Sequence, residues 1–486
     1  MSAVVRVAKN SLILLLAQII SYILAFVYTL YIARYLSPNN FGILSFSIAL
    51  TTIISLVGDI GLSWLFSRDV SRDIKLTRYY LSKIIPAKII LSIIAYVIIL
   101  LCIFFMGISG DQALVVGIIG ISMVLNIFSN IFQAFYQVKE RMEYIGLGQL
   151  IYAVLLFCGI FGGIAFRFDI KGIALIYAGS SVLTLVFYII VLICRFPREM
   201  PVLNRLDMHD EKRFLFKAFK QCWPVGLAVI FNGVYSWIDT VILSALQNPG
   251  EAGLYNASYR MLLTIYIIPG ALSYAVFPLM ARYYVKDRPM AELTMEKSIK
   301  YLFVLGIPIA VATALLAERF ILLLYGDSFL SAAVGLRLMI WSIPFYFANV
   351  IFNNYFNVAN KQTVYTIACI LMALISTVLN LLFVPRLGLI AASSIRILTD
   401  LSGFIFFISQ ISLTGYKIKW KSSLLTVIKI IGACVIMALF INFLYNLNLL
   451  ILMVFSVFIY FISLLALKML DANDMKIIRQ IIFIKW

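Results

Sequence analysis

Charged side chains inside apolar segments are the residues of this sequence best suited to binding or chemistry. A charge at the centre of a membrane helix costs about 2.5–3.5 kcal/mol on insertion scales, so such residues usually serve a function. In this chain they are Asp59, Lys88, Asp239, Arg260, Arg337, Arg396, Asp400 and Lys429. The cations are suited to holding an anionic group, and the carboxylates to holding a proton or a monovalent cation.

Composition places these charges in a polytopic membrane protein. Of 486 residues, 63% are hydrophobic and 12% are charged, and the mean hydropathy is +1.04. The first apolar run, Ser11 to Ile32, is long enough to cross a membrane, so we expect a retained first helix and not a cleaved signal peptide. The net charge of +18 lies in loops between apolar runs, which argues against nucleic-acid binding.

The sequence contains few residues that could bind a metal ion or act in covalent catalysis. The six cysteines lie within or at the ends of apolar runs without a CxxC motif, which indicates packing only. The one histidine, His209, lies in a charged loop. We therefore predict no metal site, no catalytic residues and no bound cofactor, and we expect a carrier, not an enzyme.

The apolar runs predict an all-α integral membrane protein with fourteen spans. Both termini are predicted to be cytoplasmic, because the opposite side holds few cations under the positive-inside rule. The region 318–331 is predicted as a short interfacial helix. The spans run near 11–33, 41–65, 84–106, 113–137, 144–166, 171–194, 221–246, 253–279, 299–317, 332–357, 363–384, 389–413, 423–445 and 449–467.

An internal repeat organises these spans. The segment from Pro38 to Ser47 returns as Pro249 to Ser258, with six predicted spans between the copies, so both copies face the same side of the membrane. Shorter echoes occur at 135–138 with 355–358, and at 172–174 with 388–390. The repeat predicts two parallel six-helix lobes followed by two further helices. The predicted parts are an N-lobe at 1–194, a cytoplasmic linker at 195–220, a C-lobe at 221–413, and helices 13 and 14 with a cytoplasmic tail at 414–486.

Two stretches of sequence resemble a known transporter family. ARYLSPNNFGILSFSIAL at the end of the first span and WIDTVILSALQNPGEAGLYNASYRML across spans seven and eight are similar to the polysaccharide flippases, Wzx-like members of the MOP (MATE-like) superfamily. The resemblance extends over essentially the whole chain. It implies that the protein moves a lipid-linked oligosaccharide from the cytoplasmic to the outer leaflet, through a cavity between two six-helix lobes.

Arg260 is the first candidate for contact with such a cargo. The repeat aligns it with Ala49, so a cation breaks the symmetry of the halves. A guanidinium offers paired donors to the phosphate or diphosphate of a lipid-linked sugar. The alternatives are a structural pair with Asp239 or a side chain that reaches the outer interface.

Two other arginines are candidates for substrate binding. Arg34 ends the first span near the external side, where it either guides the headgroup or anchors the helix. Arg396 lies four residues before Asp400, a spacing at which an ion pair forms readily. The two alternatives for this pair are contact with the cargo and a mutual ion pair that lines the cavity. Lys88 is expected to extend to the cytoplasmic interface.

Acidic and aromatic residues complete the predicted site. Asp239, Asp59 and Asp400 are candidates for coupling transport to H⁺ or Na⁺, with pairing to Arg68 as the alternative for Asp59. Tyrosine and tryptophan rings can stack on sugars, although most serve as interfacial belts. The aromatic residues that we expect near the path are Trp237, Tyr255 and Tyr259.

The sequence thus predicts a flippase for polyprenyl-(pyro)phosphate-linked oligosaccharide in the cytoplasmic membrane of a prokaryote. Its expected partners are the lipid-linked oligosaccharide, membrane lipid and polysaccharide-assembly proteins, and its expected state is a monomer. The alternative is a cation-coupled multidrug or metabolite antiporter of the same superfamily. A major-facilitator transporter or a membrane glycosyltransferase fits less well, because the loop after the second span contains no glycine and no loop is long enough for a catalytic domain.

Overall fold

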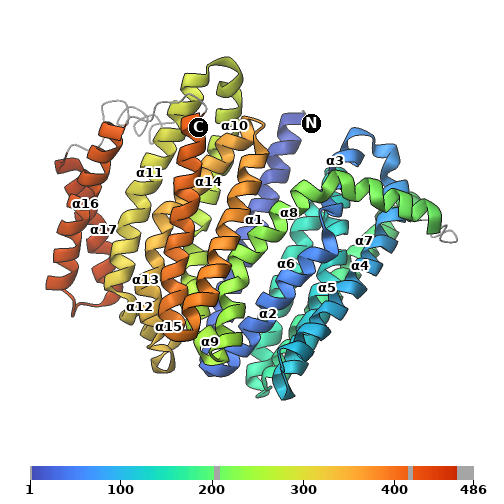
Figure 1. Cartoon of the computed structure of the whole chain (residues 1–486), viewed down its shortest axis with the longest axis horizontal. Coiled ribbons are helices and arrows are strands. Elements are labelled where there is room, and N and C mark those ends of the chain that lie inside the picture. The colour runs from blue at the N-terminus through green and yellow to red at the C-terminus, as the bar shows by residue number, and fades with distance from the viewer. Residues whose placement is uncertain (1–2, 202–207, 414–419, 468–486) are drawn as a thin grey trace. The chain divides into compact units, whose positions relative to one another are not determined.

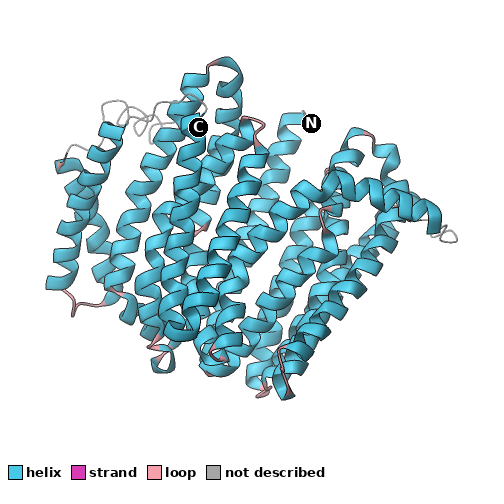
Figure 2. Cartoon of the chain, viewed as in Figure 1, coloured by secondary structure: helices cyan, strands magenta, loops and turns pink. Residues whose placement is uncertain are grey.

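The structure is a computed structural model, and it describes residues 3–201, 208–413 and 420–467. Helices joined by short loops account for nearly all of these residues (Figure 2). The linker residues 202–207 and the predicted tail from 468 onward lie outside the described residues. Thirteen helical segments among those described are long and apolar enough to cross a membrane. The chain is therefore an all-helical, multi-pass membrane protein.

The helices follow one another in the order shown in Figure 1. The first seven are α1 (Ala3–Tyr35), α2 (Pro38–Asp59), α3 (Leu62–Arg72), α4 (Thr77–Phe105), α5 (Gly110–Val138), α6 (Met142–Ala165) and α7 (Ile170–Arg195). The next five are α8 (Met208–Leu246), α9 (Pro249–Ile265), α10 (Ile267–Lys286), α11 (Arg288–Leu315) and α12 (Ala317–Tyr325). The last five are α13 (Ala332–Met339), α14 (Ile343–Val358), α15 (Gln362–Leu413), α16 (Trp420–Phe443) and α17 (Leu449–Ala466).

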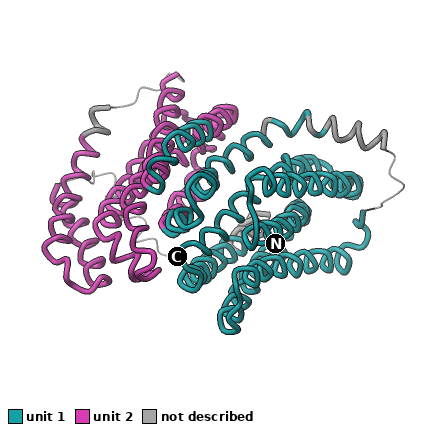
Figure 3. Tube along the Cα trace, turned by 60° about the horizontal axis from the view of Figure 1, so that its bottom comes forward, with its two compact units in different colours: residues 1–257, 373–389 teal, residues 258–372, 390–486 magenta. Residues whose placement is uncertain are grey.

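The chain divides into two compact units, coloured separately in Figure 3. Unit 1 comprises Met1–Ala257 and Ala373–Leu389, and unit 2 comprises Ser258–Met372 and Ile390–Trp486. The boundaries of these units come from contacts between residues. The boundaries of the predicted lobes and linker come from the sequence repeat. The lobe boundaries therefore stay a prediction.

Unit 1 is built around α2 and α5. Helix α2 lies against α4, α5 and α8, and α5 also lies against α7, while α1 packs on α6. Its larger core holds the buried aromatic residues Phe135, Tyr136 and Tyr188. The hydroxyl of Tyr136 donates to the backbone carbonyl of Tyr188 at 2.6 Å, so even this aromatic core satisfies its polar atom.

Unit 2 is built around α11, which lies against α10, α14 and α16. The hairpin of α16 and α17 is held to it by polar contacts as well as by apolar packing. The hydroxyl of Tyr460 donates to the carbonyl of Val304 at 2.7 Å. In addition, the guanidinium of Arg319 donates to the carbonyls of Tyr445 and Leu447 in the loop between the two helices.

Two breaks divide segments that are continuous in hydropathy. The predicted span 41–65 is interrupted after Asp59, because Ile60 and Gly61 have φ values of 37° and 79°. The chain then turns into the short helix α3. Helix α15 spans 52 residues but has non-helical backbone at Gly388 (φ 50°). There the carboxylate of Glu251 accepts from the amide of Leu389 at 2.9 Å, which caps the second part of the helix.

The two copies of the repeat meet each other through glycine. A Cβ placed on Gly42 would overlap the carbonyl oxygen of Pro249, and one placed on Gly253 would overlap that of Pro38. Each copy therefore inserts its glycine against the first residue of the other copy's helix. Close backbone approach through small residues is a common device of membrane helices, which gain van der Waals contact from it.

We expect Gly42→Ala to destabilise the protein by about 3 kcal/mol, because the added methyl group must push two helix backbones apart. Thermal unfolding of the purified protein in detergent would measure the effect. Gly162→Ala is the matched control, since a Cβ at Gly162 meets nothing within 4 Å. Equal melting temperatures for the two variants would contradict the close approach.

Candidate functional site

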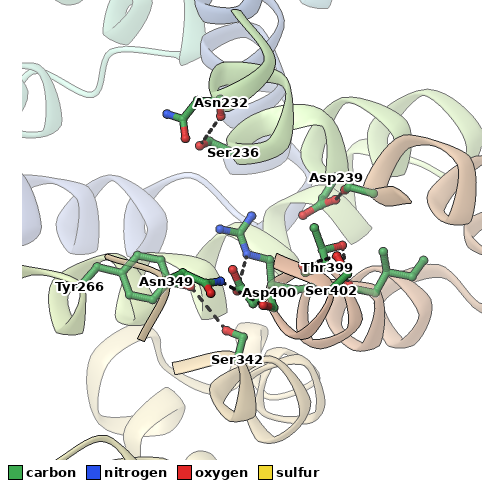
Figure 4. A network of polar contacts seen from close by, with 12 residues as sticks. Asn232, Ser236, Asp239, Tyr266, Ser342, Asn349, Thr399, Asp400 and Ser402 are labelled. Atoms are coloured by element: carbon green, nitrogen blue, oxygen red, sulfur yellow. Dashed lines mark hydrogen bonds and ion pairs between the residues drawn. The ribbon is translucent and has the colours of Figure 1, made fainter. Parts of the chain in front are cut away.

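A buried carboxylate lies at the centre of polar contacts in unit 1. Asp239 of α8 is 1% exposed, and its carboxylate is labelled in Figure 4. It accepts hydrogen bonds from Tyr255 Oη at 2.7 Å, Ser376 Oγ at 2.8 Å and Asn380 Nδ2 at 2.7 Å. All three donors are neutral. Each of them directs a polar hydrogen at the carboxylate oxygens.

Asn380 gives this cluster an unused acceptor. The residue is fully buried, and its Nδ2 also donates to the carbonyl of Ser376 at 2.8 Å. Its Oδ1 has no hydrogen-bond partner among the described residues. A carboxylate next to an amide oxygen is a ligand set suited to a hard cation. Ser376 and Asn380 were not predicted, although a hydroxyl and an amide four residues apart in an apolar helix are a recognisable signal.

A second charged centre lies in unit 2. The ion pair expected from the spacing of Arg396 and Asp400 is present, with 3.6 Å between Nε and Oδ2 and with both side chains at most 2% exposed. The guanidinium of Arg396 also lies over the ring of Tyr259, 5.0 Å from its centroid. A carboxylate and an aromatic face both attract a buried guanidinium.

Neutral polar groups surround this ion pair. Asn349 of α14 donates from Nδ2 to the backbone carbonyl of Asp400 at 3.0 Å (Figure 4). The hydroxyl groups of Tyr266 and Ser342 are 3.4 Å apart, and both residues are labelled in the same view. Asn349 of α14, Asp400 of α15, and Tyr266 and Ser342 at the starts of α10 and α14 thus supply polar groups to unit 2.

Arg260 lies in α9, in the part of that helix assigned to unit 2, and is partly exposed. Within its unit, no described carboxylate forms an ion pair with its guanidinium. The buried hydroxyl of Tyr325 in α12 is close enough for the two to interact electrostatically. Burial raises the pKa of Tyr325, and the positive charge of Arg260 acts to lower it. The Arg260 side chain therefore presents an uncompensated cation within unit 2.

The other predicted contact residues occupy different settings. Arg34 is exposed in the last turn of α1, beside Tyr35, whose hydroxyl donates to the carbonyl of Phe168 at 2.9 Å. Trp237 is partly exposed and lies two residues before Asp239 in α8. Tyr255 and Tyr259 are 1% and 3% exposed, so in this structure they contact charged protein groups. Their proposed stacking on sugar stays a prediction.

The expectation that Lys88 extends to the interface is wrong. The side chain of Lys88 is completely buried, and Nζ contacts Asp59 Oδ1, Ser63 Oγ at 2.9 Å and the carbonyl of Ile127 at 3.0 Å. Three acceptors match the three donors of an ammonium group. The partner of Asp59 is therefore Lys88, and Arg68 instead donates to Asp69 at 2.7 Å.

These arrangements consist of ion pairs and of carboxylates held by neutral hydrogen-bond donors. No group of three or more His, Cys, Asp or Glu side chains that could hold a metal ion occurs among the described residues. Unit 1 contains the Asp239 cluster and the Asp59–Lys88 pair, while unit 2 contains Arg260 and the Arg396–Asp400 pair. Each unit thus places ionisable groups within membrane-spanning helices, where binding of an ion or of a charged headgroup is the chemistry available to them.

Comparisons with known proteins agree with this chemistry. The family model described as polysaccharide biosynthesis protein matches residues 7–284, and the MatE model matches residues 224–383. A Shigella flexneri protein named as an O-antigen transporter is 23% identical over 66% of this chain and 78% of its own length. Agl15 of Haloferax volcanii, named as a low-salt glycan biosynthesis flippase, is 20% identical over 79% of each chain.

A solved structure shares the fold over nearly the whole chain. The lipid II flippase MurJ in an inward closed conformation aligns with a TM-score of 0.73 and 15% identity, covering 96% of this chain and 99% of that one. At this identity the likeness concerns the fold alone.

We expect Asp59→Asn to destabilise the protein by about 3–5 kcal/mol, because it leaves the buried Lys88 ammonium without its counter-charge. The double variant Asp59→Asn/Lys88→Met should recover most of this loss, since it removes both charges. Thermal unfolding of the three proteins in the same detergent measures the cycle. A double variant no more stable than Asp59→Asn would show that the pair is not coupled.

Proposed function

This chain belongs to the polysaccharide biosynthesis protein family, and from that premise we propose that it is a lipid-linked oligosaccharide flippase. It is a membrane transporter of the MOP superfamily type. In the proposed function it moves a polyprenyl-(pyro)phosphate-linked oligosaccharide from the cytoplasmic to the outer leaflet by alternating access. The product serves assembly of surface polysaccharide or glycan. The names of the two curated relatives, an O-antigen transporter and a glycan flippase, support this substrate class.

The observation that carries the proposal is the place of Arg260, a partly exposed guanidinium in a membrane-spanning segment. A guanidinium within membrane helices is costly unless an anion or water meets it. The phosphate of a lipid-linked sugar is an anion that must cross the same region, and a guanidinium binds phosphate through two parallel hydrogen bonds. In this proposal Arg260 holds the phosphate during crossing, while Arg34 and Arg396 are further contacts for the headgroup.

Coupling to an ion gradient is assigned to Asp239. The proposed ligand is H⁺ or Na⁺, with the carboxylate of Asp239 and the free Oδ1 of Asn380 as its oxygen donors. Asp59 and Asp400 are weaker candidates, because each carboxylate already faces a cation of the protein. A group that binds a cation only when its existing hydrogen bonds rearrange can link ion binding to a change of conformation.

The membrane topology completes the proposal. We count α15 as two crossings that meet at Gly388, which makes fourteen crossings from thirteen helical segments. An even number places both termini on the cytoplasmic side, as the loop charges suggest. The protein is proposed to act as a monomer beside polysaccharide-assembly proteins.

A second candidate function is a cation-coupled multidrug or metabolite antiporter. The match of the MatE model to residues 224–383 favours it, because that stretch contains Asp239. An exporter of cationic drugs would use acidic residues for its cargo. Arg260 within this stretch and Arg396 beyond its end oppose cationic cargo, so the flippase is the better supported function.

We expect Arg260→Ala to lower the transport rate of a lipid-linked oligosaccharide about tenfold or more, since it removes a charge-assisted contact with the phosphate. The measurement is flipping in reconstituted vesicles. Arg260→Lys should retain part of the activity, because it keeps the charge but not the paired donors. Arg337→Ala is the control, since Arg337 is an exposed arginine paired with Glu318. Wild-type rates in a folded Arg260→Ala protein would refute the assignment.

Asp239→Asn should abolish the dependence of flipping on an imposed Na⁺ or H⁺ gradient, because it removes the charge that attracts the cation. Rates with and without each gradient, compared in vesicles of the same composition, would measure this. Asp111→Asn, which changes an exposed carboxylate paired with Lys171, is the control. If Asp239→Asn responds to both gradients like the wild type, the coupling site lies elsewhere.

A further inference from the structure

Helix α14 carries an unusual number of amides for a membrane-spanning segment. Asn349, Asn353, Asn354 and Asn357 all lie within Ile343–Val358, which contains no charged residue. The candidate span that includes this helix, Ala332–Val358, has a mean hydropathy of 1.4, the lowest of the thirteen. Polar side chains in such segments usually hydrogen-bond to neighbouring helices or line a substrate path.

Two of the four amides hold α14 to other helices. Asn349 donates to the backbone of Asp400 in α15, and Asn354 donates to Ser273 Oγ in α10 at 2.8 Å. The side chains of Asn353 and Asn357 hydrogen-bond to no other described helix. Asn357 Nδ2 donates to Asn353 Oδ1 at 3.0 Å, within the same helix, and no other described residue hydrogen-bonds to either side chain. Hydrogen bonding between helices therefore explains only two of the four asparagines.

Asn353 and Asn357 share one face of α14 with an aromatic residue. Tyr346, Asn353 and Asn357 are spaced by seven and four residues, which places them along one side of a helix, and all three are partly exposed. The ring of Tyr346 is stacked on that of Tyr266, with centroids 3.6 Å apart and an angle of 12°. The residues between them in sequence, such as Ile351 and Phe356, are buried.

An unused acceptor lies beside this face. Asn349 is 7% exposed, and its Oδ1 has no hydrogen-bond partner among the described residues. Figure 4 shows its side chain beside Asp400, to whose backbone only the amide nitrogen donates. Together with Asn353 Nδ2 and Asn357 Oδ1, this oxygen gives α14 both donors and acceptors that nothing else in the described chain uses.

We propose that the face of α14 formed by Tyr346, Asn353 and Asn357 binds the hydroxyl groups of the oligosaccharide during transport. The inference rests on the proposed flippase function and assigns a place to the sugar, separate from the phosphate. Neutral amides donate and accept in equal measure, as hydroxyl groups do. An aromatic ring adds a flat apolar surface for the carbon-bound hydrogens of a sugar ring.

The chemistry of this face excludes the other parts of the cargo. A phosphate would require a cation, and α14 contains none. A polyprenyl tail would leave the amides without partners in an apolar setting, which is costly. A polyhydroxyl ligand satisfies the amides, and it accounts for their position inside a membrane span.

The test compares two cargoes in reconstituted vesicles. One is a lipid-linked oligosaccharide, and the other is the same polyprenyl phosphate without sugar. We expect Asn353→Ala/Asn357→Ala to lower flipping of the sugar-bearing lipid roughly tenfold, from the loss of two or more hydrogen bonds. Flipping of the bare phosphate should change by less than about twofold. Asn353→Gln/Asn357→Gln retains the amides and should recover part of the loss.

Controls separate this inference from the function on which it rests. Asn442→Ala removes an exposed asparagine from α16 and should flip both lipids like the wild type. A wild-type protein that flips no lipid-linked oligosaccharide would reject the proposed function itself. If the wild type flips it and the double alanine variant does so equally well, or if that variant loses both cargoes to the same extent, α14 does not bind the sugar.

Discussion

A charge inside a membrane protein must be matched by the protein itself, because hydrocarbon supplies neither water nor counter-ions. This protein meets the constraint in different ways at different places. Asp239 accepts hydrogen bonds from the neutral side chains of Tyr255, Ser376 and Asn380. Lys88 is neutralised by a carboxylate and fully enclosed, so it stabilises the fold around the break after α2. The same physical demand is thus met by neutral donors at Asp239 and by an ion pair at Lys88.

Sequence reasoning was most successful where the signal was local. Long apolar runs predicted an all-helical membrane protein, and the four-residue spacing of Arg396 and Asp400 predicted their ion pair. The contact between Lys88 and Asp59 joins different helices, and no local pattern reports it. A lysine near a helix end satisfies the same hydropathy pattern whether it turns outward or inward. The direction of the lysine side chain depends on whether a carboxylate lies next to it in the protein interior.

Neutral amides were the residues that sequence reasoning overlooked. Attention to charge found Asp239 but not Asn380, which completes its surroundings, and it passed over the asparagines of α14. An amide lowers the hydropathy of a helix less than a charge does, so it does not interrupt an apolar run. Its hydrogen-bonding capacity must nevertheless be met. For the proposed oligosaccharide flippase this distinction matters, because an amide can both donate to and accept from a sugar hydroxyl group.

The reciprocal contact of Gly42 and Gly253 with the two prolines also bears on how the chain has changed since its halves were alike. A larger side chain at either glycine would displace the other copy, so neither half can alter this stretch independently. Elsewhere each half can acquire substitutions alone, as the difference between Ala49 and Arg260 illustrates. Mutual steric restraint is therefore a physical reason for the two segments to keep the same proline and glycine spacing.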